Sequence, residues 1–255
     1  MGYSPSDYNS YQTSGNKTPT LSLWQDVLLS PSVDTFAKYL GEADLGRAVL
    51  WLLTSSAISG LLQMLSLAMG SGRTFLQALP PDLRRELPIR AGAFSFGTLL
   101  CGIPTWIVVT LLSAFIGIGL IHLIAKLLGG EGSFTETFFL MAAASAPITL
   151  VSGALGLLSG LLGLIPFLGA IFGVLFGLVG MVVGIYNLVL SAMAVAAAHR
   201  FSLGKGFAAV LLPFVVFFLL GCCCTAAGLV TFSSDMENIF EKIQRELNML
   251  LTLYV

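Results

Sequence analysis

The stretch that decides the fold is Pro166–Ala198, PFLGAIFGVLFGLVGMVVGIYNLVLSAMAVAAA, which is almost entirely apolar. A helix of this length is about 50 Å long, at 1.5 Å of rise per residue. The hydrocarbon core of a bilayer is only about 30 Å thick. The stretch therefore predicts a transmembrane helix that protrudes from the bilayer or bends within it.

The rest of the chain repeats this signal. Hydrophobic residues make up 56% of the 255 residues and charged residues 10%, whereas a soluble domain carries about 25% charged residues. Four further apolar stretches are long enough to cross a bilayer; they are Arg47–Met69, Gly102–Leu128, Phe134–Leu158 and Gly206–Phe232. We therefore expect an all-α membrane protein, a bundle of five transmembrane helices with amphipathic surface helices at both ends.

The composition divides the chain into four parts. Residues 1–22 are polar, lack the apolar core of a signal peptide and predict a disordered tail. Residues 23–45 predict an amphipathic interfacial segment, either two short helices on the membrane surface with Trp24 at headgroup level or a cap over the bundle. Residues 46–232 form the five-helix transmembrane domain. Residues 233–255 predict a C-terminal amphipathic helix with an apolar face.

Two boundaries need comment. Ala91–Leu128 is too long for one untilted span, so we expect Pro104 to divide it into an entry segment and a spanning helix, with two membrane crossings as the alternative. At the next turn, Ser133 and Glu136 have the spacing of a capping box. If Ala91–Leu128 crosses once, six basic residues fall on each side of the membrane, so charge does not decide the orientation.

Glycines repeat at helix spacing in two of the predicted spans. Small residues four apart let helix backbones approach closely in lipid. We favour packing within the bundle, between its third, fourth and fifth helices, over a contact with another chain. The predicted helix-packing residues are Gly156, Gly160, Gly169, Gly173, Gly177, Gly180 and Gly184.

A few polar residues lie near or within the spans. His122 and Lys126 are one turn apart, with Glu131 and Glu136 close behind in sequence. These four residues favour interfacial anchoring with a local ion pair over a proton relay or an ion site, because they lie at the membrane edge. Asn187 predicts a structural hydrogen bond, to Gln63 or to a freed backbone carbonyl.

Several functions are disfavoured by the sequence. No spacing typical of a catalytic or nucleotide-binding motif occurs, so we predict a non-enzymatic protein without catalytic or cofactor-binding residues. Cys101 and the run Cys222–Cys224 cannot converge on one ion, so no metal site is expected. The net charge of −1 argues against nucleic-acid binding. The absence of carboxylates from the helix centres argues against an ion-coupled carrier.

Two polar segments resemble the Yip-domain family of membrane proteins. The first runs from Ile121–Leu123 to the turn Gly129–Phe134, and this turn reads GGEGSF. The second is Ala198–Gly206, which reads AHRFSLGKG, and Pro147 lies between the two segments. The resemblance covers Gly46–Phe232. It implies a five-helix bundle with a cytoplasmic N-terminus. Eukaryotic members act in vesicle trafficking and associate with small GTPases, and they carry an Asp-Leu-Tyr-Gly-Pro motif that this chain lacks. That difference argues against GTPase binding and makes the chain similar to the bacterial branch.

The sequence thus favours a non-enzymatic scaffold or interaction subunit that acts in membrane organisation or trafficking. Its expected partners are the lipid bilayer and either another membrane protein or a second copy of the chain. Its expected location is the bacterial cytoplasmic membrane, as a multi-pass protein. The alternatives are a transporter or channel-like component and an accessory subunit of a larger membrane complex.

Overall fold

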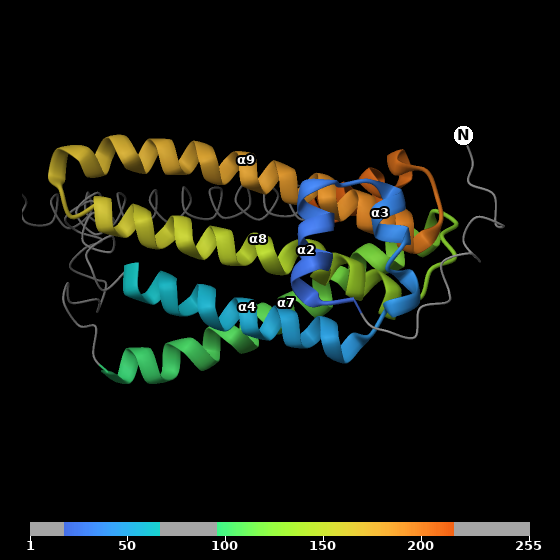
Figure 1. The fold of residues 1–255 in the computed structure, drawn as a ribbon, viewed down its shortest axis with the longest axis horizontal. Helices are drawn as coiled ribbons and strands as arrows, with labels where there is room; N and C mark the ends of the chain where they lie inside the picture. Colours follow the sequence, from blue (N-terminus) through green and yellow to red (C-terminus); the bar gives the residue numbers. More distant parts are fainter. Residues whose placement is uncertain (1–17, 67–95, 217–255) are drawn as a thin grey trace, which may run out of the picture. The chain divides into compact units, whose positions relative to one another are not determined.

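The computed structural model describes residues 18–66 and 96–216. The chain divides into two compact units, Met1–Val210 and Leu211–Val255, and the description below concerns the first. Every regular element in the described residues is a helix (Figure 1). These elements are α2 (Thr20–Leu29), α3 (Val33–Ala37), η2 (Leu40–Glu42), α4 (Leu45–Ser66), α7 (Phe96–Leu127), α8 (Phe134–Leu162), α9 (Pro166–His199) and a helix over Leu203–Val216.

The described residues contain four helices that are long and apolar enough to cross a membrane. Their spans are Leu45–Ser66, Gly102–Leu127, Phe134–Leu162 and Ile171–His199. The chain is therefore a multi-pass α-helical membrane protein. Most of the fifth predicted span lies outside the described residues, as do the C-terminal amphipathic segment and nearly all of the predicted N-terminal tail.

The prediction that Pro104 divides Ala91–Leu128 was wrong. α7 continues through Pro104 as one helix. Proline removes one hydrogen bond, but a helix in lipid has no water to satisfy the groups that a break would expose. Continuing the helix is the cheaper solution, and the segment gives one span rather than two.

The helix ends follow local hydrogen bonding. The predicted capping box is present: the Glu136 N–H donates to Ser133 Oγ at 3.2 Å and the Ser133 N–H donates to Glu136 Oε2 at 2.6 Å. α9 ends at His199 and is capped by Arg200, whose φ of 53° and ψ of 41° are left-handed. The Phe201 N–H then bonds the Ala196 carbonyl, so that the turn after α9 is tightly closed.

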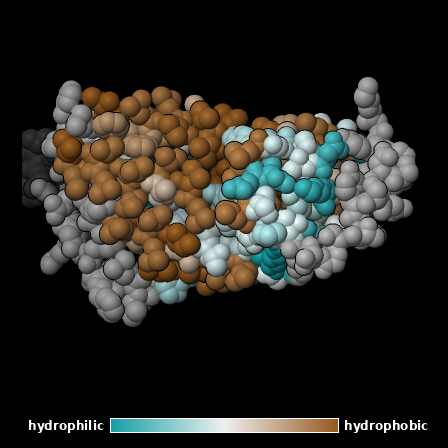
Figure 2. Space-filling model, in the orientation of Figure 1, coloured by the Kyte–Doolittle hydropathy of each residue, from teal (hydrophilic) through white to brown (hydrophobic). Residues whose placement is uncertain are grey.

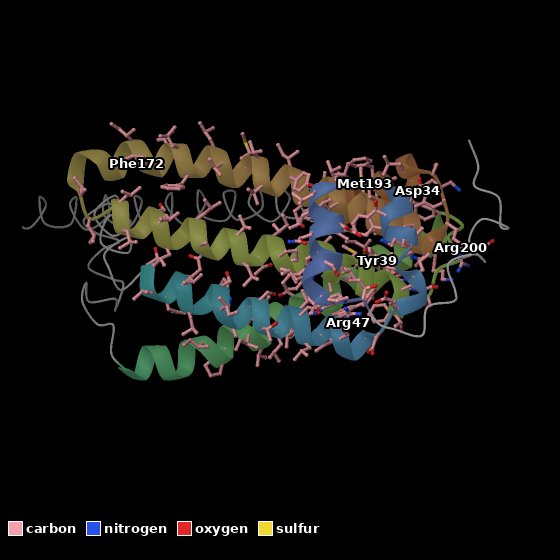
Figure 3. All side chains as sticks on the ribbon, in the orientation of Figure 1. Asp34, Tyr39, Arg47, Phe172, Met193 and Arg200 are labelled. Carbon is pink, nitrogen blue, oxygen red and sulfur yellow. The ribbon has the colours of Figure 1, made fainter. Side chains whose placement is uncertain are left out.

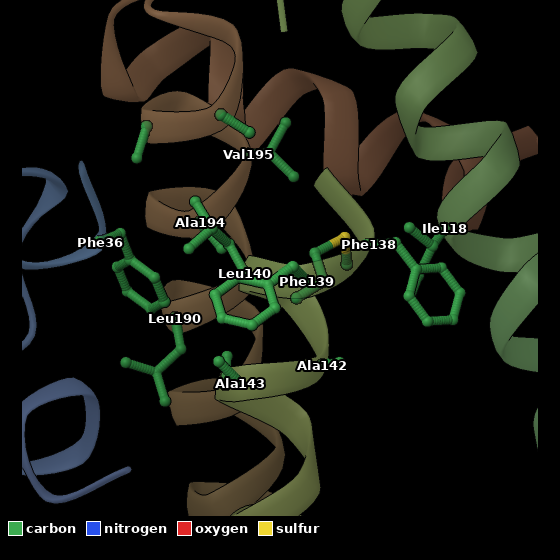
Figure 4. Packing of buried hydrophobic residues seen from close by; sticks show 14 of the residues in the cluster. Phe36, Ile118, Phe138, Phe139, Leu140, Ala142, Ala143, Leu190, Ala194 and Val195 are labelled. Carbon is green, nitrogen blue, oxygen red and sulfur yellow. The ribbon is translucent and has the colours of Figure 1, made fainter. Parts of the chain in front are cut away.

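The densest packing lies where the first half of α8 meets the last third of α9 (Figure 4). The side chains of Phe138–Leu140 are fully buried there; the Phe138 ring packs on Phe115 of α7 and the Phe139 ring on Trp51 of α4. Alanines dominate both sides, and their small side chains let the two backbones approach closely. The buried alanines are Ala142, Ala143, Ala144, Ala146, Ala192, Ala194, Ala196, Ala197 and Ala198.

Residues Thr18–Asp44 fold over one end of this core, and we call them the cap. Leu23 and Val27 of α2 and Phe36 of α3 are fully buried in the same hydrophobic cluster as α8 and α9. The Tyr186 hydroxyl of α9 donates to the Leu28 carbonyl at 2.5 Å, which satisfies a carbonyl in the last turn of α2. Residues 23–45 thus pack on the bundle through α2 and α3, and their expected position at the membrane surface stays a prediction. The indole of Trp24 packs edge-on against that of Trp51.

α4 and α8 meet along a seam of serine and glycine. The Ser66 hydroxyl donates to the Gly156 carbonyl at 2.9 Å. A Cβ atom built on Gly153 would lie 2.9 Å from the Cα of Ser59, and one on Gly156 would lie 2.9 Å from the Gln63 amide nitrogen. Gly160 meets Ser66 in the same way. Only glycine allows the two helices to approach this closely.

The glycine repeat of α9 has different surroundings. A Cβ atom on Gly169 would lie 3.0 Å from the Cα of Gly163, in the connection between α8 and α9. No described atom lies within 4 Å of a Cβ built on Gly173, Gly177, Gly180 or Gly184. The described helices do not fill this face, so the expected role of these glycines in packing remains a prediction.

The two glycine sets allow a matched test. We expect Gly153→Ala to lower the free energy of unfolding by about 1–3 kcal/mol, because the added methyl group overpacks the seam against the Ser59 backbone. Gly177→Ala adds the same methyl group to open space among the described residues and serves as the control. Thermal unfolding in one detergent measures both, and equal destabilisation by the two variants would contradict the seam.

Candidate functional site

The charged residues of the described chain lie at one end of the bundle. This end comprises the cap and the turns at residues 129–133 and 200–202, and we call it the polar end. On the face drawn in Figure 2 the most hydrophilic surface gathers over this end, and Figure 3 shows Asp34, Arg47 and Arg200 there. The charged residues are Asp26, Asp34, Lys38, Glu42, Asp44, Arg47, Lys126, Glu131, Glu136, Arg200 and Lys205.

The two polar turns are packed directly on each other. The Glu131 N–H donates to the His199 carbonyl at 3.3 Å. A Cβ atom on Gly132 would collide with the Ala198 carbonyl, and one on Gly130 would collide with the His199 ring. Gly129 has a φ of +86°, which favours glycine for conformational reasons. The glycines of this turn are thus required by the contact between the turns.

Charged side chains reinforce the contact between the two turns. Glu136, at the start of α8, lies 3.7 Å from the Arg200 guanidinium. The Lys205 ammonium donates to the Leu128 carbonyl at 3.0 Å, which satisfies a carbonyl at the end of α7. Both pairs are exposed or half-exposed, so each contributes little to stability in water. Their role is to fix how the turns meet.

Beneath the turns, two imidazoles share one hydroxyl group, and we call His122, Thr137 and His199 the histidine cluster. His122 Nδ1 and His199 Nε2 each lie 3.0 Å from Thr137 Oγ1. The Thr137 hydroxyl donates to the Ser133 carbonyl at 2.9 Å. A hydroxyl has one proton and accepts through two lone pairs, so both ring nitrogens act as N–H donors. The hydrogen-bond pattern thus assigns the tautomers: Nδ1–H for His122 and Nε2–H for His199.

Aromatic rings and burial hold the cluster rigid. Thr137 is fully buried and His199 is 1% exposed. The His199 ring stacks on Phe201 with 5.7 Å between centroids, and the His122 ring meets Phe134 edge-on at the same separation. The cluster therefore joins α7, α8 and α9 at a single buried point.

The chemistry available to the cluster is limited. Neither imidazole donates a hydrogen bond to a carboxylate among the described residues, and the Thr137 proton is committed to a backbone carbonyl. No group of three metal-ligating side chains occurs in the described part of the chain. The arrangement positions helices and can accept a proton at a ring nitrogen.

The cap has its own buried ion pair. The Arg47 guanidinium lies 3.0 Å from Glu42 Oε2, with both side chains less than 15% exposed, and it stacks over Trp51 at 4.8 Å from the ring centroid. Thr18 closes the network: its hydroxyl and its N–H donate to the Glu42 carboxylate, and its carbonyl accepts from Arg47. The first described residue is thereby tied to the start of α4.

Hydrogen bonding lowers the pKa of two cap carboxyls. Burial alone would raise the pKa of Glu42, but the hydrogen bonds from Thr18 and Arg47 more than offset it, so that the pKa lies below its ordinary 4.5. The pKa of Asp26 is lowered from 3.8 by the Tyr39 hydroxyl, at 2.5 Å, and by the Lys38 ammonium. Both carboxylates are held in their charged form.

The remaining predicted residues do not form one site. Lys126 and Glu131 are exposed at the polar end, apart from the buried cluster. Glu136 serves both the capping box and the pair with Arg200. Asn187 does not bond Gln63, whose amide faces Gly156 of α8. The Oδ1 atom of Asn187 is buried with no hydrogen-bond partner in the described residues. Of the two partners expected for Asn187, Gln63 thus faces another helix, and the bond to a freed backbone carbonyl stays a prediction.

Thr137 and His199 were not predicted as members of a site. His199 was noted only as part of a polar turn, and Thr137 lies inside an apolar helix. One signal was available: the chain has two histidines, and each lies in one of the two sequence segments on which the family resemblance rests.

Comparison with known proteins agrees with this fold. The model of the Yip1 domain family matches residues 26–224. The chain belongs to this family. The match begins within the cap and includes both turns of the polar end as well as the four described spans of the Yip1 domain. Searches of curated proteins and of solved structures gave no match. Members of the family are generally membrane proteins linked to trafficking, and the family is not known as enzymatic.

Removing the shared hydroxyl tests the histidine cluster of the Yip1 domain. We expect Thr137→Val to lower the free energy of unfolding by about 1–3 kcal/mol, because both imidazole N–H groups lose their acceptor. Thr137→Ser keeps the hydroxyl and should stay close to wild type. The control is Thr149→Val in the same helix, where the hydroxyl bonds only the Ser145 carbonyl one turn back. Thermal unfolding measures the stability of all three variants. Equal destabilisation by Thr137→Val and Thr149→Val would contradict the cluster.

The lowered pKa of Glu42 and Asp26 predicts acid opening of the cap. An acid with a lowered folded pKa stabilises the fold above its unfolded pKa and loses that contribution as the pH falls through the lowered value. The cap should stay closed above pH 4.5, the ordinary pKa of Glu42, and open below it. Glu42→Gln should weaken the cap by about 1.5–3 kcal/mol and flatten this pH dependence.

Fluorescence of Trp24 and Trp51 in a Trp106→Phe background reports this opening, since both indoles lie under or within the cap. Asp34→Asn, at an exposed carboxylate of α3, is the control and should titrate like wild type. An unchanged acid transition in Glu42→Gln would show that the carboxylate does not hold the cap.

Proposed function

We propose that this Yip1-domain protein is a non-enzymatic interaction subunit, or scaffold, whose polar end binds protein partners. The observation that carries the proposal is the gathering of all described charged side chains at that end. The long apolar faces of α7 and α9 suit lipid, with Val174 and Val182 more than 60% exposed. Within the described part of the chain, the polar end is therefore the surface that a partner reading charge and shape would meet.

The charge pattern favours a protein over a lipid headgroup or a nucleic acid. Acidic and basic side chains alternate over the cap and the two turns, and several are already paired with each other. An anionic lipid or a nucleic acid would be attracted by an excess of basic residues. A mixed surface instead suits a protein with the complementary pattern.

The rigidity of this end supports the same proposal. The cap is fixed by buried apolar side chains and by the Arg47–Glu42 pair, and the turns are fixed by the histidine cluster. A preformed surface loses little conformational entropy on binding, which favours affinity. We further propose that the chain has five membrane spans and that the polar end faces the cytoplasm of a bacterial cell. The orientation rests on the family resemblance.

Site-specific photo-crosslinking in native membranes tests the proposal. A photo-reactive amino acid at Asp34 or Glu131, both exposed at the polar end, should give discrete protein adducts. The same probe at Val174 or Met181, on the lipid-facing part of α9, should give none of those adducts. Protein adducts at Val174 with none at the polar end would overturn the proposal. Solute uptake into proteoliposomes that depends on His122 or Asn187 would favour the transporter alternative.

A further inference from the structure

The second ring nitrogen of His199 has no use in the cluster as described. Nε2 donates to Thr137, so Nδ1 carries a bare lone pair. This atom is buried and has no hydrogen-bond partner among the described residues. The Gly130 backbone packs directly against this side of the ring, where even an added Cβ atom would collide with Nδ1. A proton is the one ligand small enough to bind there.

We propose that the histidine cluster is a proton-operated clasp, which holds the turns at 129–133 and 200–202 together while both imidazoles are neutral and releases them when His199 is protonated. In the closed state the Glu131 N–H reaches the His199 carbonyl, so the residue that would take up the proton is also the one that anchors the facing turn. This inference rests on the proposed function, because opening the clasp would change the shape of the polar end that binds partners.

The charges around His199 make its protonation unfavourable in the closed state. On α7, the His122 ring faces the His199 ring with 5.0 Å between their centroids, and Lys126 lies one turn beyond His122. From α8, His199 faces Glu136, which is already paired with Arg200. Glu131 is exposed on the facing turn and Lys205 bonds the end of α7. The nearest carboxylate is thus engaged, and a buried cation would sit beside a second imidazole.

Opening the turns relieves this cost, because it returns the imidazolium to water. An imidazole in water gains its proton near pH 6.5, so the closed clasp has its full stability above that pH and loses stability progressively as the pH falls below it. The equilibrium constant for opening changes by at most about tenfold per pH unit for each proton taken up. This window lies well above the acid opening expected of the cap.

Hydrogen exchange on the full chain in lipid nanodiscs tests the clasp. After correction for the intrinsic pH dependence of exchange, we expect the Glu131 amide, which donates to the His199 carbonyl, to lose about tenfold protection between pH 7 and pH 5.5. The double variant His122→Asn, His199→Gln keeps an N–H donor at each position but cannot titrate. It should show the same protection at both pH values.

Glu131→Gln, at an exposed carboxylate of the facing turn, is the matched control for carboxylate titration, and it should keep the wild-type pH response. Equal protection of the wild type at both pH values would overturn the proposal, as would loss of protection in the double variant. The amide of residue 131 reports the clasp whether or not the polar end binds a partner, so failure of the clasp is distinguishable from failure of the proposed function.

Nitrogen NMR of the wild type gives a second measurement that needs no variant. The chain has two histidines, and selective ¹⁵N labelling resolves the tautomer of each. At pH 7.5 we expect one ring protonated at Nδ1 and the other at Nε2, as the shared hydroxyl requires. Two rings with the same tautomer, or a charged ring at that pH, would overturn the clasp.

Discussion

The close contact of α8 and α9 near the polar end depends on side-chain size. Alanines occupy most of the facing positions, so the two backbones approach closely and Thr137 comes within hydrogen-bonding distance of His199. A larger side chain at these positions would separate the helices and take the shared hydroxyl away from one imidazole. The burial of the cap on the same cluster also depends on this contact. The polar end is thus organised by small apolar residues beneath it.

The bundle is packed unevenly along its length. Toward the polar end, α8 and α9 bury nearly every side chain, whereas α9 between Ile171 and Ile185 exposes large apolar residues. In water such a surface would be unstable, but in a bilayer lipid tails solvate it as well as protein does. Local opening should therefore be rarest at the polar end, where fixed geometry matters for recognition.

The membrane fold could be predicted from the sequence, because the length of the apolar stretches locates the membrane spans and local composition locates the helix ends. The capping box of Ser133 and the ends of α8 and α9 needed only local rules. The course of α7 through Pro104 did not follow, since a helix in lipid tolerates what would break it in water. The histidine cluster was missed for another reason. Thr137 and His199 are 62 residues apart, and only the packing of two helices brings them together. Periodicity within a single helix carries no information on that pairing.

The link between α8 and α9 has a consequence for how the protein enters its membrane. From Thr137 to Ala198 the chain carries no ionisable acidic or basic side chain, and this stretch includes the far turn at Gly163–Ile165. Transfer of a charged loop across a bilayer is costly, and this loop has no charge to transfer. The two helices can therefore insert as one hairpin. Glu136 at one outer end and Arg200 and Lys205 at the other keep both ends of this hairpin on the same side of the membrane.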